Sequence, residues 1–167
     1  MSTEEWFVER VGIAAEADGL SRIAGRLFGA LMLSEAPRSL DELAEALQVS
    51  KASVSVETRR LAERGVFERV SMTGDRRDYY QLSPDFFAQL IRHRVSRWAE
   101  LHSLAGEVRR GSALSAAVQD RLAYVDDVNR FVLARVDEAL HDWAARADGM
   151  PGPASRASAG SRERRPA

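Results

Sequence analysis

The sequence predicts a mainly α-helical protein that contains one small β-hairpin, and three observations lead to this fold class. Residues 39–64 hold two short amphipathic segments joined by a connection of about three residues, which is the pattern of a helix-turn-helix. Residues 66–82 hold two runs of strand-forming residues around a polar loop. Longer helical patterns flank both sides. We therefore expect a winged helix-turn-helix with additional N- and C-terminal helices.

The first helix of the pair has a clear start signal. Ser39 is followed three residues later by Glu42, and at this spacing each side chain can accept a hydrogen bond from the other residue's backbone amide. The apolar residues that recur at helical spacing after this capping box are Leu40, Leu43, Ala44 and Leu47. This segment therefore predicts an amphipathic helix that ends just before Gln48.

The second helix is predicted to begin at Ser50, which would act as its N-cap. Val49 and Val54 flank this cap at the positions of a hydrophobic staple, which fixes the angle at which a helix starts. Gly65 stands where a helix would end in a left-handed residue. The residues expected to point inward are Val54, Thr58 and Leu61.

The wing is predicted from the next two segments, Val66–Met72 and Asp78–Leu82, which are rich in strand formers. The loop between them, Thr73–Arg77, is polar and contains the glycine that a hairpin loop favours. Arg76 and Arg77 would lie at the tip, where they can reach a phosphate backbone or a minor groove.

These residues resemble the winged helix of MarR-type transcriptional regulators, whose wing carries an Asp-x-Arg pattern that Asp75 and Arg77 match here. Gly19–Arg26 and Gly74–Tyr79 resemble more narrowly the GbsR-like branch of that family. The resemblance covers residues 18–90. It implies a dimeric, sequence-specific regulator of transcription, such as a repressor, that binds a pseudo-palindromic operator in double-stranded DNA.

The expected DNA contacts lie on the outward side of the second helix and at the wing tip. The first turns of the helix would enter the major groove, where small hydroxyls and a valine methyl suit close approach to base edges. We expect Lys51, Ser53, Ser55 and Val56 to form the reading face. Arg59, Arg60 and Arg64 would hold phosphates. The candidate residues on the helix are Ser50, Lys51, Ala52, Ser53, Ser55, Val56, Arg59 and Arg60, and those on the wing are Asp75, Arg76 and Arg77.

Two helices are predicted before this region, over residues 4–17 and about 20–33. The candidate apolar side of the first comprises Trp6, Phe7, Val11, Ala14 and Ala15. In the second, Gly25 and Gly29 are four residues apart and would allow another helix to approach closely. We favour packing inside one subunit as the explanation of this pair.

Two long helices are predicted after the wing. Ser83-Pro84-Asp85 indicates the start of the first, with Ser83 as the cap and Pro84 in the first turn, and the helix should run to about Arg110. The last helix carries an apolar stripe that is too long for a small winged helix to cover, so it implies a partner helix from the same chain or from a second copy. The stripe, which we interpret as a homodimer contact, comprises Val118, Leu122, Val125, Val128, Val132, Val136, Leu140 and Trp143.

The chain is thereby divided into four segments. Residues 1–35 form N-terminal helices for packing or dimerisation, residues 36–83 the DNA-binding domain, and residues 84–147 the C-terminal dimerisation helices. Residues 148–167 are rich in small residues and proline, which predicts a disordered tail. Because this tail contains several arginines, two interpretations stay open: it is a flexible clamp on DNA, or it is a segment without function.

The composition argues against an enzyme. The chain has no cysteine and three histidines, and no His-Glu-x-x-His spacing, so we expect no metal and no cofactor. Asp126, Asp127, Asp137 and Glu138 are interpreted as ordinary solvated charges on the last helix.

Charge and hydropathy indicate a soluble, cytoplasmic protein. The acidic start, Met1–Glu5, is unlike a secretory leader, and no apolar run approaches the roughly 20 residues that a membrane helix requires. The formal net charge is −1, which is low for a DNA-binding protein. The second helix of the pair nevertheless has more basic than acidic residues, and local charge decides contacts within a screening length of about 8 Å.

The resemblance also implies a small effector held between the DNA-reading domain and the dimerisation helices. The GbsR-like branch includes a choline-responsive repressor of glycine betaine synthesis. Trp6, Trp98 and Trp143 would supply an aromatic box for a quaternary ammonium group, although tryptophans spread over three helices are more often core residues. Two alternative functions would use the same fold, namely a protein-interaction module and a ligand sensor without direct control of DNA.

Overall fold

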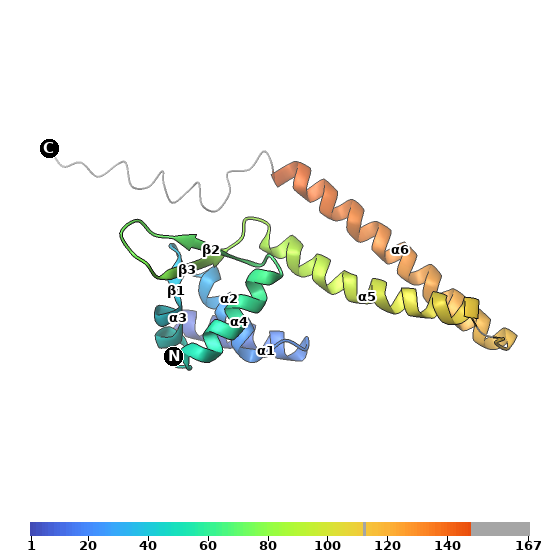
Figure 1. The fold of residues 1–167 in the computed structure, drawn as a ribbon, viewed down its shortest axis with the longest axis horizontal. Helices are drawn as coiled ribbons and strands as arrows, with labels where there is room; N and C mark the ends of the chain where they lie inside the picture. Colours follow the sequence, from blue (N-terminus) through green and yellow to red (C-terminus); the bar gives the residue numbers. More distant parts are fainter. Residues whose placement is uncertain (112, 148–167) are drawn as a thin grey trace. The chain divides into compact units, whose positions relative to one another are not determined.

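The structure is a computed structural model that describes residues 1–111 and 113–147 (Figure 1). It divides into two compact units, of which the first is Met1–Gln89 and the second begins at Leu90. The predicted segments 1–35 and 36–83 therefore belong to one compact unit. The predicted tail, residues 148–167, lies outside the described residues.

The observed elements confirm the predicted fold class of a mainly helical chain with a winged helix-turn-helix. The first unit contains α1 (Thr3–Ala17), α2 (Arg22–Met32), β1 (Arg38–Ser39), α3 (Leu40–Leu47), α4 (Lys51–Glu63), β2 (Phe67–Ser71) and β3 (Asp78–Leu82). Helix α5 (Phe86–Gly111) begins in the first unit and continues into the second, which also contains α6 (Ala116–Ala147).

The wing is a three-stranded antiparallel sheet in the order β1-β3-β2. The hairpin register pairs Phe67 with Leu82 and Ser71 with Asp78, and the short β1 pairs Arg38 with Tyr80. Strand β1 was not predicted, because two residues are too few to show an alternating pattern. Its second residue, Ser39, is also the N-cap of α3 and forms the predicted capping box with Glu42, so the helix-turn-helix starts directly from the sheet.

The core of the first unit lies where α2, α3 and α4 meet the sheet. Its buried side chains come from each of these elements. They include Leu27, Leu31, Leu43, Leu47, Val54, Leu61, Val66 and Phe67.

Helix α1 packs closely against α2 through glycines. A Cβ atom on Gly25 would lie 2.5 Å from the Cβ of Ala15 and 2.8 Å from the Cα of Gly12, and one on Gly29 would lie 3.2 Å from the Cα of Val8. The favoured interpretation of the glycine pair, packing within one subunit, is therefore confirmed. The predicted apolar side of α1 was partly wrong, because Trp6 and Ala14 are exposed while Val8 and Gly12 face α2.

Helix α5 begins two residues later than the sequence predicted. Ser83 does not cap it, because the Ser83 hydroxyl donates to the carbonyl of Gly65 at 2.5 Å and the Ser83 amide donates to the carbonyl of Val66 at 3.0 Å. These bonds hold Ser83 against the end of α4, and Pro84 lies in the turn before the helix. Gly65 itself has φ +69°, as its predicted role at the end of α4 requires.

The second unit is a pair of helices in which α6 runs back alongside α5 (Figure 1). Asp126 of α6 is only 6% exposed and accepts a hydrogen bond from Nη1 of Arg109, while Nδ1 of His102 lies 3.2 Å from its other oxygen. The interpretation of Asp126 as a solvated charge was therefore wrong. Its position on α6 faces α5, where the guanidinium of Arg109 compensates the buried carboxylate.

The same helix pair accounts for part of the predicted apolar stripe. Leu140 is buried and Val132 and Val136 are half-buried, so α5 of the same chain provides some of the expected cover. Val128 and Trp143 remain 42% and 54% exposed. Within residues 1–111 and 113–147, no helix combines the length and hydropathy needed to span a bilayer.

Substituting Gly25 with alanine is expected to destabilise the first unit by about 1–3 kcal/mol, because α1 and α2 must separate to admit the methyl group. Gly106→Ala is the matched control: this helical glycine has only the Nη1 atom of Arg110 within reach of an added Cβ, at 3.3 Å. It should stabilise slightly, by up to about 1 kcal/mol. Urea unfolding followed by circular dichroism measures both, and equal effects would contradict the packing described.

Candidate nucleic-acid interface

The orientation of α4 is fixed by the three residues that were predicted to point inward. Val54 and Thr58 are 0% exposed and Leu61 is 3% exposed. At the start of the helix, the Ser50 hydroxyl accepts a hydrogen bond from the Ser53 amide at 3.1 Å. Gln48 adopts a left-handed conformation with φ 51°, which turns the chain sharply between α3 and α4. The opposite side of α4 is therefore presented to solvent.

That opposite side coincides only in part with the reading face that the sequence analysis assigned. Because a helix advances about 100° per residue, the side facing away from Val54 and Thr58 is centred on Ala52, Val56 and Arg59, which are exposed. Val56 is 54% exposed. Ser53 and Ser55 lie on the two flanks and are half-buried, so the four residues Lys51, Ser53, Ser55 and Val56 do not form one face.

The cations on α4 differ in how strongly they are engaged. Nζ of Lys51 lies 2.8 Å from a carboxylate oxygen of Asp41, and Nη1 of Arg60 lies 3.2 Å from one of Glu57. The Lys51–Asp41 pair is exposed on both sides, and such pairs contribute only about 0–1 kcal/mol, so another anion can replace Asp41. Glu57 is half-buried, whereas the guanidinium of Arg60 is exposed. The side chain of Arg59 makes no hydrogen bond or ion pair with any described residue.

The capping hydroxyls at the start of α4 are less available than the sequence suggested. The hydroxyl oxygens of Ser50 and Ser53 are hydrogen-bonded to each other at 2.8 Å, and the Ser50 hydroxyl also accepts a hydrogen bond from the Ser53 amide. The role of Ser50 is thus to begin the helix, while Ala52 and Val56 form its open surface.

At the wing tip, Asp75 holds Arg77 in place. Nε and Nη2 of Arg77 donate to the same oxygen of Asp75 at 2.9 and 2.6 Å, and the Arg77 amide donates to the other oxygen at 2.9 Å. Tyr79 completes the group: its hydroxyl donates to Asp75 at 2.8 Å, and the Arg77 guanidinium lies 5.3 Å from its ring centre. Sequence reasoning missed Tyr79, although its position four residues after Asp75 on a returning strand was visible.

This network changes the charge that the wing offers to a ligand. Hydrogen bonds from Arg77 hold the pKa of Asp75 well below its ordinary value of 3.8, so the carboxylate stays charged and the network is lost only in strong acid. Arg77 is therefore largely neutralised by its neighbour. Arg76 is exposed and makes no hydrogen bond or ion pair within the described part of the chain.

The three tryptophans do not lie in the core. Trp6, Trp98 and Trp143 are 51%, 49% and 54% exposed, so the interpretation of these residues as core residues is wrong for the single chain. Trp6 belongs to the first unit and the other two to the second. The aromatic box stays a prediction. Among the described residues, no group of three or more His, Asp and Glu side chains could hold a metal ion.

Comparisons with known proteins agree with this geometry. The sequence profile of the MarR family matches residues 18–78. The HTH-type transcriptional regulator MmpR5 of Mycobacterium tuberculosis is 37% identical over 141 residues, which cover 79% of this chain and 86% of that protein. A crystal structure of a transcriptional regulator is 34% identical with a TM-score of 0.76, covering 86% of this chain and 99% of the other.

A more distant relative is the HTH-type transcriptional repressor OpcR of Bacillus subtilis. It is 27% identical over 100 residues, or 60% of this chain. The match spans 54% of that protein's length.

The wing network predicts an unusual titration of Tyr79. Ionising its hydroxyl would place a phenolate beside the Asp75 carboxylate to which it donates, and this hydrogen bond raises the pKa of Tyr79 above its ordinary value. Asp75→Asn should lower the pKa of Tyr79 toward its ordinary value, because the negative charge next to the phenolate is removed. NMR titration of labelled tyrosine measures the change.

Asp78→Asn serves as the control, since Asp78 pairs with Arg69 at 2.6 Å and lies beside the same loop. It should leave the titration of Tyr79 unchanged. An identical Tyr79 pKa in the wild type and in Asp75→Asn would show that the network is not formed in solution.

Proposed function

The chain belongs to the MarR family of HTH-type transcriptional regulators, and from this premise we propose that it binds double-stranded operator DNA as a homodimer. The family consists of regulators of transcription and not of enzymes. The observation that carries the proposal is the exposed side of α4, which starts with a capped N-terminus and presents small side chains while its other side is buried in the core.

Helix α4 is proposed to lie in the major groove. Ala52 and Val56 are short, so the helix backbone can approach the base edges closely, and their methyl groups can contact thymine. Ser55 on one flank offers a hydroxyl that can donate or accept. A helix of this kind discriminates through a few contacts, each mismatch costing about 1–3 kcal/mol.

Phosphate contacts are proposed for the cations that carry no strong internal pair. The side chains of Arg59 on α4 and Arg76 on the wing have no described partner. Lys51 pairs with the exposed Asp41, and Arg60 with the half-buried Glu57. These side chains compensate for the overall net charge of −1, because phosphate binding depends on charge within a screening length. Arg77, which the sequence favoured, is proposed to shape the wing.

Dimerisation is proposed to use the outer side of α6. Tyr124, Val128 and Phe131 are 71%, 42% and 65% exposed. Their spacing of four and then three residues places them on one side of the helix, and Asp126, which faces α5, lies nearly opposite. A second copy packed on this side would bury the apolar residues of α6 that α5 leaves exposed. The dimer would then present two α4 helices to the two half-sites of a pseudo-palindrome.

The narrower assignment to the GbsR-like branch is supported by the two motifs at Gly19–Arg26 and Gly74–Tyr79. With it we propose that the protein is a repressor whose affinity for the operator responds to a small molecule. One of the relatives, OpcR, is named a repressor.

Selection of binding sites from random DNA tests the role of α4. Val56→Ala and Ser55→Ala should relax the preference at one or two base pairs in each half-site, because a methyl or hydroxyl contact to a base is lost. Arg59→Ala is the matched variant for a phosphate contact, and it should weaken binding evenly across sequences. If the Val56 and Ser55 variants select the wild-type motif with unchanged information content, α4 is not the reader.

The salt dependence of binding tests the assignment of the wing arginines. Arg76→Ala should reduce the slope of log affinity against log salt by roughly 0.9 per contact, or about 1.8 for a dimer, since each phosphate contact releases counterions. Arg69→Ala is the control, because Arg69 already pairs with Asp78 and lies away from the tip. Equal slopes for wild type and Arg76→Ala would remove Arg76 from the interface.

The dimer is tested by light scattering at micromolar concentration. Wild type should show twice the chain mass of 18.5 kDa, and Phe131→Glu should show a monomer, because the buried glutamates would lack partners. Ala144→Glu, at an exposed position on the side of α6 opposite to Tyr124, Val128 and Phe131, should remain a dimer. A wild-type monomer would contradict the two-half-site arrangement.

A further inference from the structure

We propose that Lys51, the first residue of α4, is a modification site at which acylation of the side-chain amino group weakens the binding of operator DNA. The acyl donor is a thioester such as acetyl coenzyme A. The effect on DNA rests on the proposed function, whereas the reaction at Lys51 does not.

Lys51 differs chemically from every other strongly basic side chain of the protein. Of the 24 lysine and arginine residues, it alone is a lysine. The guanidinium group of arginine stays protonated in proteins, so it is no nucleophile toward an acyl donor. The ammonium group of lysine becomes a nucleophilic amine when it loses a proton. An acyl donor therefore has one side-chain amine to react with in this chain, and that amine lies on the proposed reading helix.

The side chain of Lys51 is accessible to such a donor. It is 60% exposed. The residues on either side, Ser50 and Ala52, are also exposed, and their short side chains leave room for the donor. In the reaction, the unprotonated Nζ attacks the carbonyl carbon of the thioester. A C–N bond forms as the C–S bond breaks, and the leaving sulfur takes up the proton that the amine releases. The product is a neutral amide and a free thiol.

Acylation changes the local charge by more than one lost cation, because Lys51 also neutralises Asp41 on α3. Nζ of Lys51 lies 2.8 Å from Oδ1 of Asp41 and donates to Oδ2 at 3.0 Å. The side chain of Asp41 is 53% exposed and makes no other hydrogen bond or ion pair within the described part of the chain. An amide at Nζ would leave this carboxylate uncompensated beside the proposed phosphate contact. The surface would lose a cation that attracts DNA and gain an anion that repels it.

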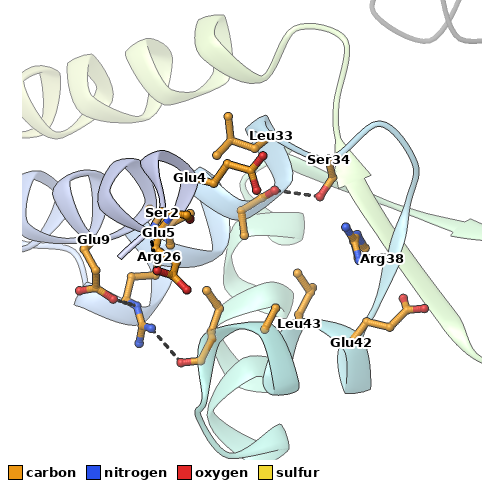
Figure 2. A pocket seen from close by; sticks show the side chains of 14 residues that line it. Ser2, Glu4, Glu5, Glu9, Arg26, Leu33, Ser34, Arg38, Glu42 and Leu43 are labelled. Atoms are coloured by element: carbon orange, nitrogen blue, oxygen red, sulfur yellow. Dashed lines mark hydrogen bonds and ion pairs between the residues drawn. The ribbon is translucent and has the colours of Figure 1, made fainter.

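The other cations near this position are not placed to take over from Lys51. Arg38 precedes Asp41 by three residues, but it lies beside Glu42 on the wall of a pocket lined by α1, α2 and α3 (Figure 2). Arg59 is eight residues further along α4, or about 12 Å at the rise of a helix. The charge at the start of α4 therefore depends on Lys51.

The fold of α4 does not depend on that charge. A cation in the first turn is opposed by the positive end of the helix dipole, so its removal relieves a small unfavourable interaction. The exposed pair with Asp41 contributes little to stability. The Ser50 cap and the buried Val54 and Thr58, which orient the helix, make no use of the amino group of Lys51. Acylation should therefore lower operator affinity in a protein that stays folded.

Acetyl coenzyme A is the probe for the reaction. The full-length protein is incubated with it at mildly alkaline pH, and peptide mass spectrometry locates the acetyl groups. We expect acetylation at Lys51 in the free protein, and a slower reaction when a duplex with the selected operator is bound. A free protein that gains no acetyl group at Lys51, or a rate that the bound operator does not change, would overturn the proposal.

The effect on DNA is measured with protein in which Lys51 is acetylated throughout, produced by incorporating acetyl-lysine during translation. Operator affinity should fall about ten- to a hundredfold at about 0.1 M salt, because one phosphate contact per subunit is lost and each contributes roughly eightfold at that salt. Lys51→Arg is the matched control for the reaction, since it keeps a cation and every other nucleophile of the chain. Its own operator affinity should be the same before and after incubation with acetyl coenzyme A.

Asp41→Asn separates the two parts of the charge change. In this variant, acetylation of Lys51 removes the cation but frees no carboxylate, so the affinity should fall by a smaller factor than in the wild type. Equal factors would overturn the role of Asp41.

Circular dichroism shows whether the acetylated protein is folded. A folded, acetylated protein with unchanged operator affinity would overturn the effect on DNA, and so would an acetylated protein that has lost its helical signal. A protein that is acetylated at Lys51 but binds no DNA in its unmodified form would instead refute the proposed function.

Discussion

The burial of one side of α4 is the constraint on which the proposed activity depends. Val54, Thr58 and Leu61 are enclosed by α2, α3 and β2, so rotating the helix would expose apolar surface and break several contacts at once. Burying two such aliphatic side chains contributes on the order of 3–6 kcal/mol. The exposed face is consequently held in one orientation by the core.

Electrostatic pairing then determines which surface cations remain available. Arg77 is held by Asp75 and Tyr79, Arg26 by Glu9 and a backbone carbonyl, and Arg109 by the buried Asp126. Each of these pairs fixes a piece of structure: the wing, the turn before α4, and the contact between α5 and α6. Among the described residues, the arginines that no such pair holds include Arg59 on α4 and Arg76 on the wing.

Much of this organisation could be predicted from local sequence, and the rest could not for physical reasons. The capping box at Ser39, the cap at Ser50 and the left-handed Gly65 depend on neighbouring residues alone, so their patterns were sufficient. The burial of Asp126 depends on α5, 17 residues away at Arg109, and no local pattern shows it. Ser83 was wrongly assigned as a cap because the local Ser-Pro-Asp pattern favours one. Its contact with Gly65, 18 residues earlier, is not visible in the local sequence. On α4, periodicity gave the inward residues, but how far Ser53 and Ser55 are covered depends on the neighbouring elements.

The most direct test of the account is an NMR spectrum of the protein bound to a duplex that carries its selected operator, with the valine methyl groups labelled. The account predicts intermolecular NOEs between the methyl groups of Val56 and protons in the major groove, and none for Val54, which is buried. A complex in which the Val56 methyl groups show no contact with DNA, while the protein remains folded and bound, would contradict the claim that α4 reads the operator.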